Sequence, residues 1–148
     1  MAAASAARNT LTRNVQNMSF TEYPVKTGTT VLFGTLVQLQ SGRLAGAASG
    51  TNRHCAGLCM ETKTGNTGGT VYAKVAWGME AKLVGLTAMT KGFMLTNSFV
   101  STNQEVTTTG VGTALVRMRA GRFTEWVSAN VVWVEVCRFA ANDIVASG

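Results

Sequence analysis

The sequence predicts an all-β fold, a small β-barrel or sandwich of short antiparallel strands with an extended N-terminal arm. The chain of 148 residues has 16 glycines and one proline, and turn residues separate its apolar segments at short intervals. Several of those segments alternate apolar and polar residues, which is the period of a strand. No helical repeat long enough for about three turns occurs after the N-terminal region. These patterns are typical of small barrels and sandwiches.

Residues 1–22 are predicted to form an N-terminal arm that binds a partner. Polar residues dominate this region, and no acidic residue precedes Glu22. Apolar residues at positions 11, 15 and 18 match one face of a helix, so the arm is either extended or a short helix induced by a partner. The Ala, Ser and Arg content is also that of an organelle transit peptide, although we favour the arm. The candidate binding residues are Arg8, Leu11, Arg13, Val15, Met18 and Phe20.

The β domain is predicted to span residues 23–140 and to begin with a hairpin. Alternate positions between 31 and 39 are mostly apolar, Ser41-Gly42 supplies a turn, and the chain returns from Arg43. The alternative is a phosphate-binding loop, which needs Lys-Ser or Lys-Thr after its last glycine. Thr35-Leu36 follows Gly34 instead, so we predict a hairpin in which the glycines mark a turn and a bend or bulge.

The rest of the domain is predicted as short strands joined by turns. One helical turn is expected within residues 87–92, and tight turns are expected at Ala120-Gly121 and at 128–130. Residues 141–148 are a C-terminal tail. The predicted strands are 55–61, 70–77, 79–86, a short strand within 101–110, 113–119, 122–127 and 131–139.

His54, Cys55, Cys59 and Cys137 have the residue types that zinc prefers. Neighbouring residues on a strand point to opposite faces, and paired C-x-x-C motifs are missing, so buried structural thiols are favoured over a metal site. The only histidine is adjacent to Cys55, and the seven acidic residues are scattered. We therefore predict no enzyme activity, no catalytic residues, no metal and no cofactor.

Arg117, Arg119 and Arg122 are predicted to form a basic, partner-facing patch. The first two alternate with apolar residues and so share a strand face, where they could hold phosphates or carboxylates. A nucleic-acid-binding face would also carry aromatic residues for base stacking. Phe123 and Trp126 fall on opposite faces of the next strand, so a protein partner is favoured.

The charge composition favours an assembling protein. The net charge is +6, yet only 14% of residues are charged, which is low for the surface of a monomer. No apolar run approaches the roughly 18 residues of a membrane helix, so we expect no membrane partner.

The order of these segments resembles the small head decoration, or capsid cement, proteins of tailed bacteriophages. The similarity covers roughly residues 25–136, and MRAGRFTEWVSAN is more basic and aromatic than the family pattern. The matching segments are VKTGTTVLFGTLVQLQSGRLAGAAS, AGLCMET, GNTGG, TVYAKVAWG, TKGFMLTNSFVST and VVWVEV.

The resemblance implies a homotrimer on the exterior of the capsid head, assembled in the host cytoplasm. It would bridge and stabilise neighbouring major capsid protein subunits, without direct contact with nucleic acid. The arm would reach the shell, with Arg8 and Arg13 facing an acidic capsid surface. Two alternatives remain: another virion β-protein (a tail tube, neck or head-fibre component) and a small OB-like nucleic-acid-binding domain.

Overall fold

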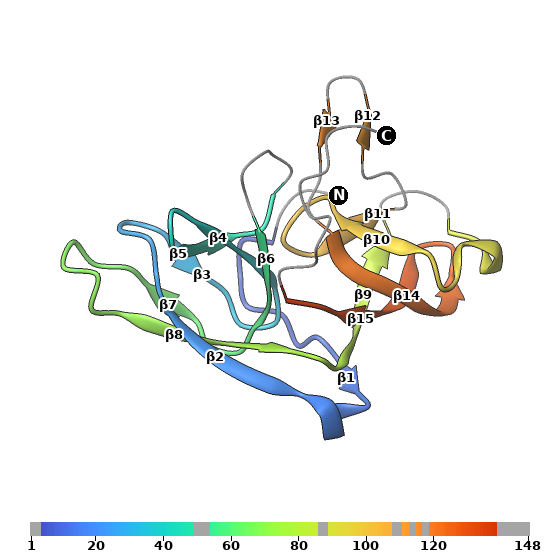
Figure 1. Cartoon of the computed structure of the whole chain (residues 1–148), viewed down its shortest axis with the longest axis horizontal. Coiled ribbons are helices and arrows are strands. Elements are labelled where there is room, and N and C mark those ends of the chain that lie inside the picture. The colour runs from blue at the N-terminus through green and yellow to red at the C-terminus, as the bar shows by residue number, and fades with distance from the viewer. Residues whose placement is uncertain are drawn as a thin grey trace.

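A computed structural model confirms the all-β fold and describes residues 4–48, 54–85, 89–107, 111–112, 115–116 and 119–138. The strands form two lobes that lie side by side (Figure 1). The elements are β1 (Thr12–Arg13), η1 (Val15–Asn17), β2 (Ser19–Pro24), β3 (Thr30–Val31), β4 (Leu36–Gln40), β5 (Arg43–Gly46), β6 (His54–Cys59), β7 (Lys63–Thr64), β8 (Tyr72–Trp77), β9 (Glu80–Gly85), η2 (Lys91–Phe93), β10 (Asn97–Val100), β11 (Glu105–Thr107), β12 (Val111–Gly112), β13 (Leu115–Val116), β14 (Arg119–Ser128) and β15 (Val131–Val136).

The first lobe is a closed barrel. Its strands follow the order β9-β11-β10-β14-β15, and β15 pairs back to β9. The β11–β9 pair is parallel, and the other pairs of the ring are antiparallel. Closure leaves these strands without a long open edge, which is how small barrels avoid unwanted pairing.

The second lobe is a sheet with the order β2-β8-β6-β4-β5 that curls toward closure. Beyond the end of β2, the backbone N–H of Lys26 donates to the carbonyl oxygen of Leu44 on β5 at 2.9 Å. The short pair β3–β7 lies at this end of the lobe. The sheet is therefore joined at one end of its outer strands and open at the other.

The hydrophobic core makes the two lobes one folding unit. One cluster includes Leu36 and Leu58 from the second lobe together with Phe123 and Val134 from the barrel. A smaller cluster fills the second lobe alone. Separating the lobes would expose the shared cluster to water, at a cost of about 25 cal/mol for each Å² of apolar surface.

The predicted hairpin is confirmed between β4 and β5. Ser41 and Gly42 have φ angles of 53° and 78°, as a two-residue turn matching the twist of a hairpin requires. The strand does not run unbroken from residue 31, because the chain turns at Gly34, where φ is 79°. This is the bend that the glycine predicted.

The tight turn predicted at Ala120-Gly121 is wrong. Both residues lie within β14, which is continuous. Across the β10–β14 pair, Ser98 lies opposite Gly121 and Phe99 lies opposite Arg119, so Ala120 is the extra residue of a bulge. Small residues favour bulges and turns alike, so the pattern does not separate the two. The turn predicted at 128–130 is confirmed between β14 and β15.

The N-terminal region belongs to the folded domain. The predicted boundary after residue 22 falls inside β2, which pairs along its length with β8. Before it, β1 pairs with β9 of the barrel. Of the two forms expected for the arm, the structure shows the extended one, interrupted by one 3-10 turn at Val15–Asn17. The predicted tail, residues 141–148, lies outside the described residues.

Candidate functional site

The N-terminal segment, residues 4–24, is held by hydrogen bonds to both lobes. On the barrel side, the N–H of Ala4 donates to the Asn103 side chain at 2.8 Å, and the N–H of Lys82 donates to the carbonyl oxygen of Leu11 at 3.0 Å. On the other side, the N–H of Arg8 donates to the carbonyl oxygen of Phe33 at 2.8 Å. The segment thus ties the lobes together across their junction.

Arg13 binds residues of its own chain. Its Nη2 lies 3.0 Å from Oε1 of Glu80, and its Nη1 lies 2.6 Å from Oε1 of Glu125. The guanidinium carbon lies 4.1 Å from the centre of the Trp133 ring, a cation–π distance. Burial alone would lower the pKa of Arg13, but the hydrogen bonds to Glu125 and Glu80 outweigh it and raise the pKa. Arg13 therefore acts as a charged clamp on the barrel.

Glu80 is the centre of this cluster. The residue is only 8% exposed, and it also accepts hydrogen bonds from the side chains of Asn14 and Thr124. A carboxylate so deeply placed needs several donors to replace water. The cluster explains why Arg13, predicted to face a capsid, faces its own domain instead.

Arg8 has intramolecular contacts as well. Its side chain donates to the Gln104 side chain, next to the backbone hydrogen bond to Phe33. Met18 packs against the shared core. Of the six predicted binding residues, these two and Arg13 therefore have structural contacts within the chain.

The other three predicted binding residues are largely exposed, although the Nζ of Lys74 lies 5.5 Å from the centre of the Phe20 ring. Leu11, Val15 and Phe20 are 54%, 47% and 48% exposed. We refer to these three side chains as the N-terminal apolar row. They lie along one anchored segment, so they are offered to a partner on a fixed backbone.

The predicted basic patch is not assembled as expected. Arg117 lies outside the described residues. Arg119 is half-buried, and its Nε donates to the carbonyl oxygen of Gly121 at 3.4 Å. Arg122 is exposed and faces Glu135 across the strand pair, with 3.9 Å between Nη2 and Oε1. A carboxylate therefore stands beside the basic group, and such an exposed pair adds little stability.

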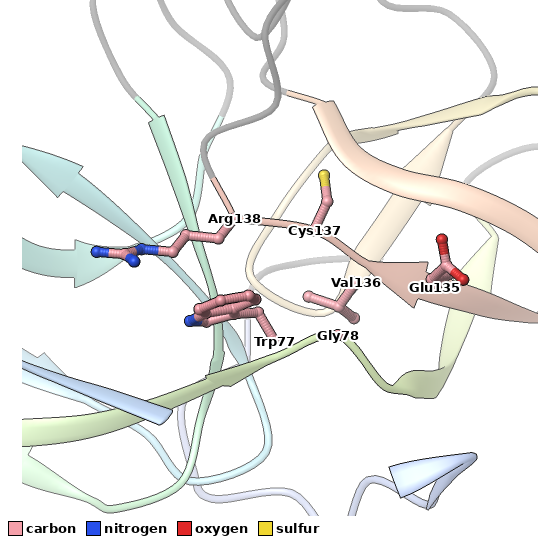
Figure 2. A pocket seen from close by; sticks show the side chains of 6 residues that line it. All are labelled: Trp77, Gly78, Glu135, Val136, Cys137 and Arg138. Atoms are coloured by element: carbon pink, nitrogen blue, oxygen red, sulfur yellow. The ribbon is translucent and has the colours of Figure 1, made fainter. Parts of the chain in front are cut away.

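A pocket of about 480 Å³ lies at the ends of β8 and β15. Figure 2 shows Arg138 extended beside the Trp77 ring, with Glu135 pointing away from both. The guanidinium carbon lies 5.4 Å from the centre of the Trp77 ring and 5.6 Å from that of Tyr23. Arg138 also donates a hydrogen bond to the Tyr23 hydroxyl. No sequence pattern joins these three residues, which only the fold brings together across the two lobes.

The cysteines are free thiols. Cys55 and Cys59 are buried on β6, and Cys137 is half-buried. Within the described part of the chain, no group of three or more His, Cys, Asp and Glu side chains is arranged to hold a metal ion. Burial raises the pKa of the Cys59 thiol to about 11. In its protonated form the thiol also donates a hydrogen bond to the carbonyl oxygen of Glu61, at 2.9 Å.

This shift predicts a loss of stability at high pH. The ordinary pKa of the thiol is 9.0, so between pH 9 and about 11 the unfolded chain releases the proton while the folded chain keeps it. The free energy of unfolding should therefore fall as pH rises through that window, by up to about 2 kcal/mol. Urea unfolding at pH 8, 9.5 and 11 tests this against Cys59→Ala, which should show a shallower decline. Equal declines would contradict the assignment.

No helix among the described residues is long and apolar enough to cross a membrane. Comparisons of the chain with protein-family models, curated proteins and solved structures give no match.

Proposed function

We propose that this chain is a virion structural protein that decorates the outside of a bacteriophage head. It binds as a homotrimer and stabilises contacts between major capsid protein subunits, after assembly in the host cytoplasm. It acts by binding and not by catalysis. The resemblance over residues 25–136 supports the proposal. The observation that carries it is the N-terminal apolar row, which the fold leaves exposed on an anchored segment.

The three exposed apolar side chains lie within residues 11–20 and offer apolar surface that a partner can bury. Only 14% of the residues are charged. Few charged groups therefore oppose contact between these apolar side chains and a partner. The backbone that carries them is already hydrogen-bonded to both lobes. Binding therefore requires little further loss of conformational entropy. The anchored segment should bind more tightly than a disordered arm with the same side chains.

The experiment combines a mass measurement with sedimentation on shells. The purified chain should form a trimer and should co-sediment with expanded phage capsid shells. Replacing Leu11, Val15 and Phe20 together by serine should weaken shell binding by at least about tenfold.

The matched control is Val127→Ser, an exposed apolar residue on β14, which is 39% exposed. This variant should bind shells as the wild type does. A monomer that ignores shells would overturn the proposal, and rings of six or long stacks in negative-stain images would indicate a tail or neck protein. Salt-sensitive retention of single-stranded DNA would indicate a nucleic-acid binder.

A further inference from the structure

The backbone of β2 has one edge that is open over part of its length. β2 is a terminal strand of its sheet, and among the described strands it pairs only with β8. Two hydrogen bonds fix which of its residues face outward. The N–H of Val25 donates to the carbonyl oxygen of Val71, and the N–H of Met60 donates to that of Lys74. Since hydrogen-bonded pairs alternate along antiparallel strands, the amides of Thr21 and Tyr23 face β8.

The N–H and C=O groups of Phe20 and Glu22 must then point away from β8. Lys26 follows the same alternation, and its outward N–H donates to the carbonyl oxygen of Leu44 on β5. The outward edge is thus occupied near Lys26, and Pro24 has no N–H to offer. The open part of the edge is the stretch around Phe20 and Glu22.

This edge is only partly protected. Natural edges are blunted by charged side chains, a proline or a bulge, and here Pro24 protects one end of β2 and Glu22 contributes one charge. The β2–β8 register is regular over all six of its pairs, with no bulge. The side chains of Phe20 and Glu22 are exposed, so a strand placed alongside would meet one apolar and one acidic group. On the β8 side, Lys74 lies opposite Glu22, and its Nζ is 5.5 Å from the centre of the Phe20 ring.

We propose that the open edge at Phe20 and Glu22 receives an extended segment of a neighbouring shell subunit. That segment has a Lys or Arg opposite Glu22 and a β-branched or aromatic residue opposite Phe20. The identity of the partner rests on the proposed function. Copies in a trimer are related by a three-fold axis, so two β2 edges cannot pair about a two-fold axis within it. The edge stays available to a different chain.

The edge is tested with a peptide probe and the ¹⁵N-labelled full chain. The probe is acetyl-Thr-Lys-Thr-Val-Thr-amide, and the control peptide has Glu in place of Lys. At millimolar probe, exchange of the Phe20 and Glu22 amide hydrogens should slow by about fivefold, while that of Thr21 should not change. The lysine peptide should bind about threefold more tightly than the control.

Two variants separate hydrogen bonding from charge. Glu22→Pro removes an outward N–H and should abolish probe binding, while slow exchange at Thr21 and Tyr23 reports that the β8 pairing is intact. Glu22→Gln should bind both peptides equally. If Glu22→Pro fails to fold, the exchange of Phe20 in the wild type still decides the question. Unchanged exchange at Phe20 and Glu22, or slow exchange before any probe is added, overturns the inference.

The same exchange experiment on expanded shells separates the two proposals. Protection of the Phe20 and Glu22 amides on shells supports both. Shell binding without protection overturns the edge as the contact and leaves the decoration function standing. If the wild-type chain binds the peptide but does not bind shells, the decoration function and the shell subunit as partner are both overturned. The edge would then still be able to accept a strand.

Discussion

Deletion of residues 1–20 should unfold the protein or leave it barely stable. The deletion removes β1, the first two residues of β2 and Met18, which packs against the shared core. It also removes Arg13 from Glu80, leaving a buried carboxylate without its cation. We expect a loss of at least about 4 kcal/mol, a large part of the stability of a domain this size.

Urea unfolding followed by circular dichroism measures this loss. Deletion of residues 1–3 is the matched control, because it leaves every contact described above in place, and it should leave the unfolding midpoint unchanged. From sequence alone, we expected residues 1–22 to be separable from the domain. If the chain that lacks residues 1–20 unfolds cooperatively at the wild-type midpoint, residues 1–20 are separable and do not stabilise the domain.

Gly34→Ala should be much more destabilising than Gly28→Ala. Both glycines have positive φ angles, 79° and 72°, so alanine costs about 1–2 kcal/mol at either position. A Cβ at Gly28 would have no atom within 4 Å, whereas at Gly34 it would overlap the carbonyl oxygen of Arg8. We expect a total of about 3–5 kcal/mol for Gly34→Ala, since residues 8–10 would have to move and lose their hydrogen bonds.

A double-mutant cycle isolates the contact with Arg8. In a chain that lacks residues 1–10, the excess cost of Gly34→Ala over Gly28→Ala should vanish, since neither the carbonyl oxygen of Arg8 nor the hydroxyl of Thr10 then occupies the space. Thermal or urea unfolding of the four variants and their two parents provides the comparison. Equal costs in the full-length chain would show that the backbone of Arg8 does not pack against Gly34.

Local patterns predicted much of the fold. The β4–β5 hairpin follows from a few adjacent residues, because Ser41 and Gly42 tolerate the positive φ angles that a two-residue turn needs. The alternation in β8 was equally clear, since Ala73 and Val75 are buried while Tyr72 is exposed. The conformation of these elements depends on residues that are close in the sequence, so the sequence pattern predicts them correctly.

The N-terminal segment was misjudged because its contacts are distant in the sequence. On β2, the residues that face inward include Ser19 and Thr21, which are polar and half-buried. A strand at the edge of a sheet needs little apolar surface, so it resembles a solvated arm in composition. Likewise, nothing near Arg13 in sequence indicates Glu80, Glu125 or Trp133 as partners.

The binding role of the N-terminal residues stays a prediction. Leu11, Val15 and Phe20 are exposed, whereas Arg8, Arg13 and Met18 have contacts within the chain. Arg8 and Arg13 were included for their charge, and charge alone does not show whether a carboxylate of the same chain is near. The Arg138 contact with Tyr23 and Trp77 had no sequence signal, because the two aromatic residues lie on β2 and β8, far from Arg138 in the sequence.

The core shared by the two lobes has a mechanical consequence. Two barrels joined by a hinge would bend at the hinge under load, and each barrel would move independently with the partner that it contacts. Here, bending at the junction would have to pull Phe123 and Val134 away from Leu36 and Leu58 and break the N-terminal tie. The two lobes therefore move as one rigid unit, and a force applied to one lobe is transmitted directly to the other.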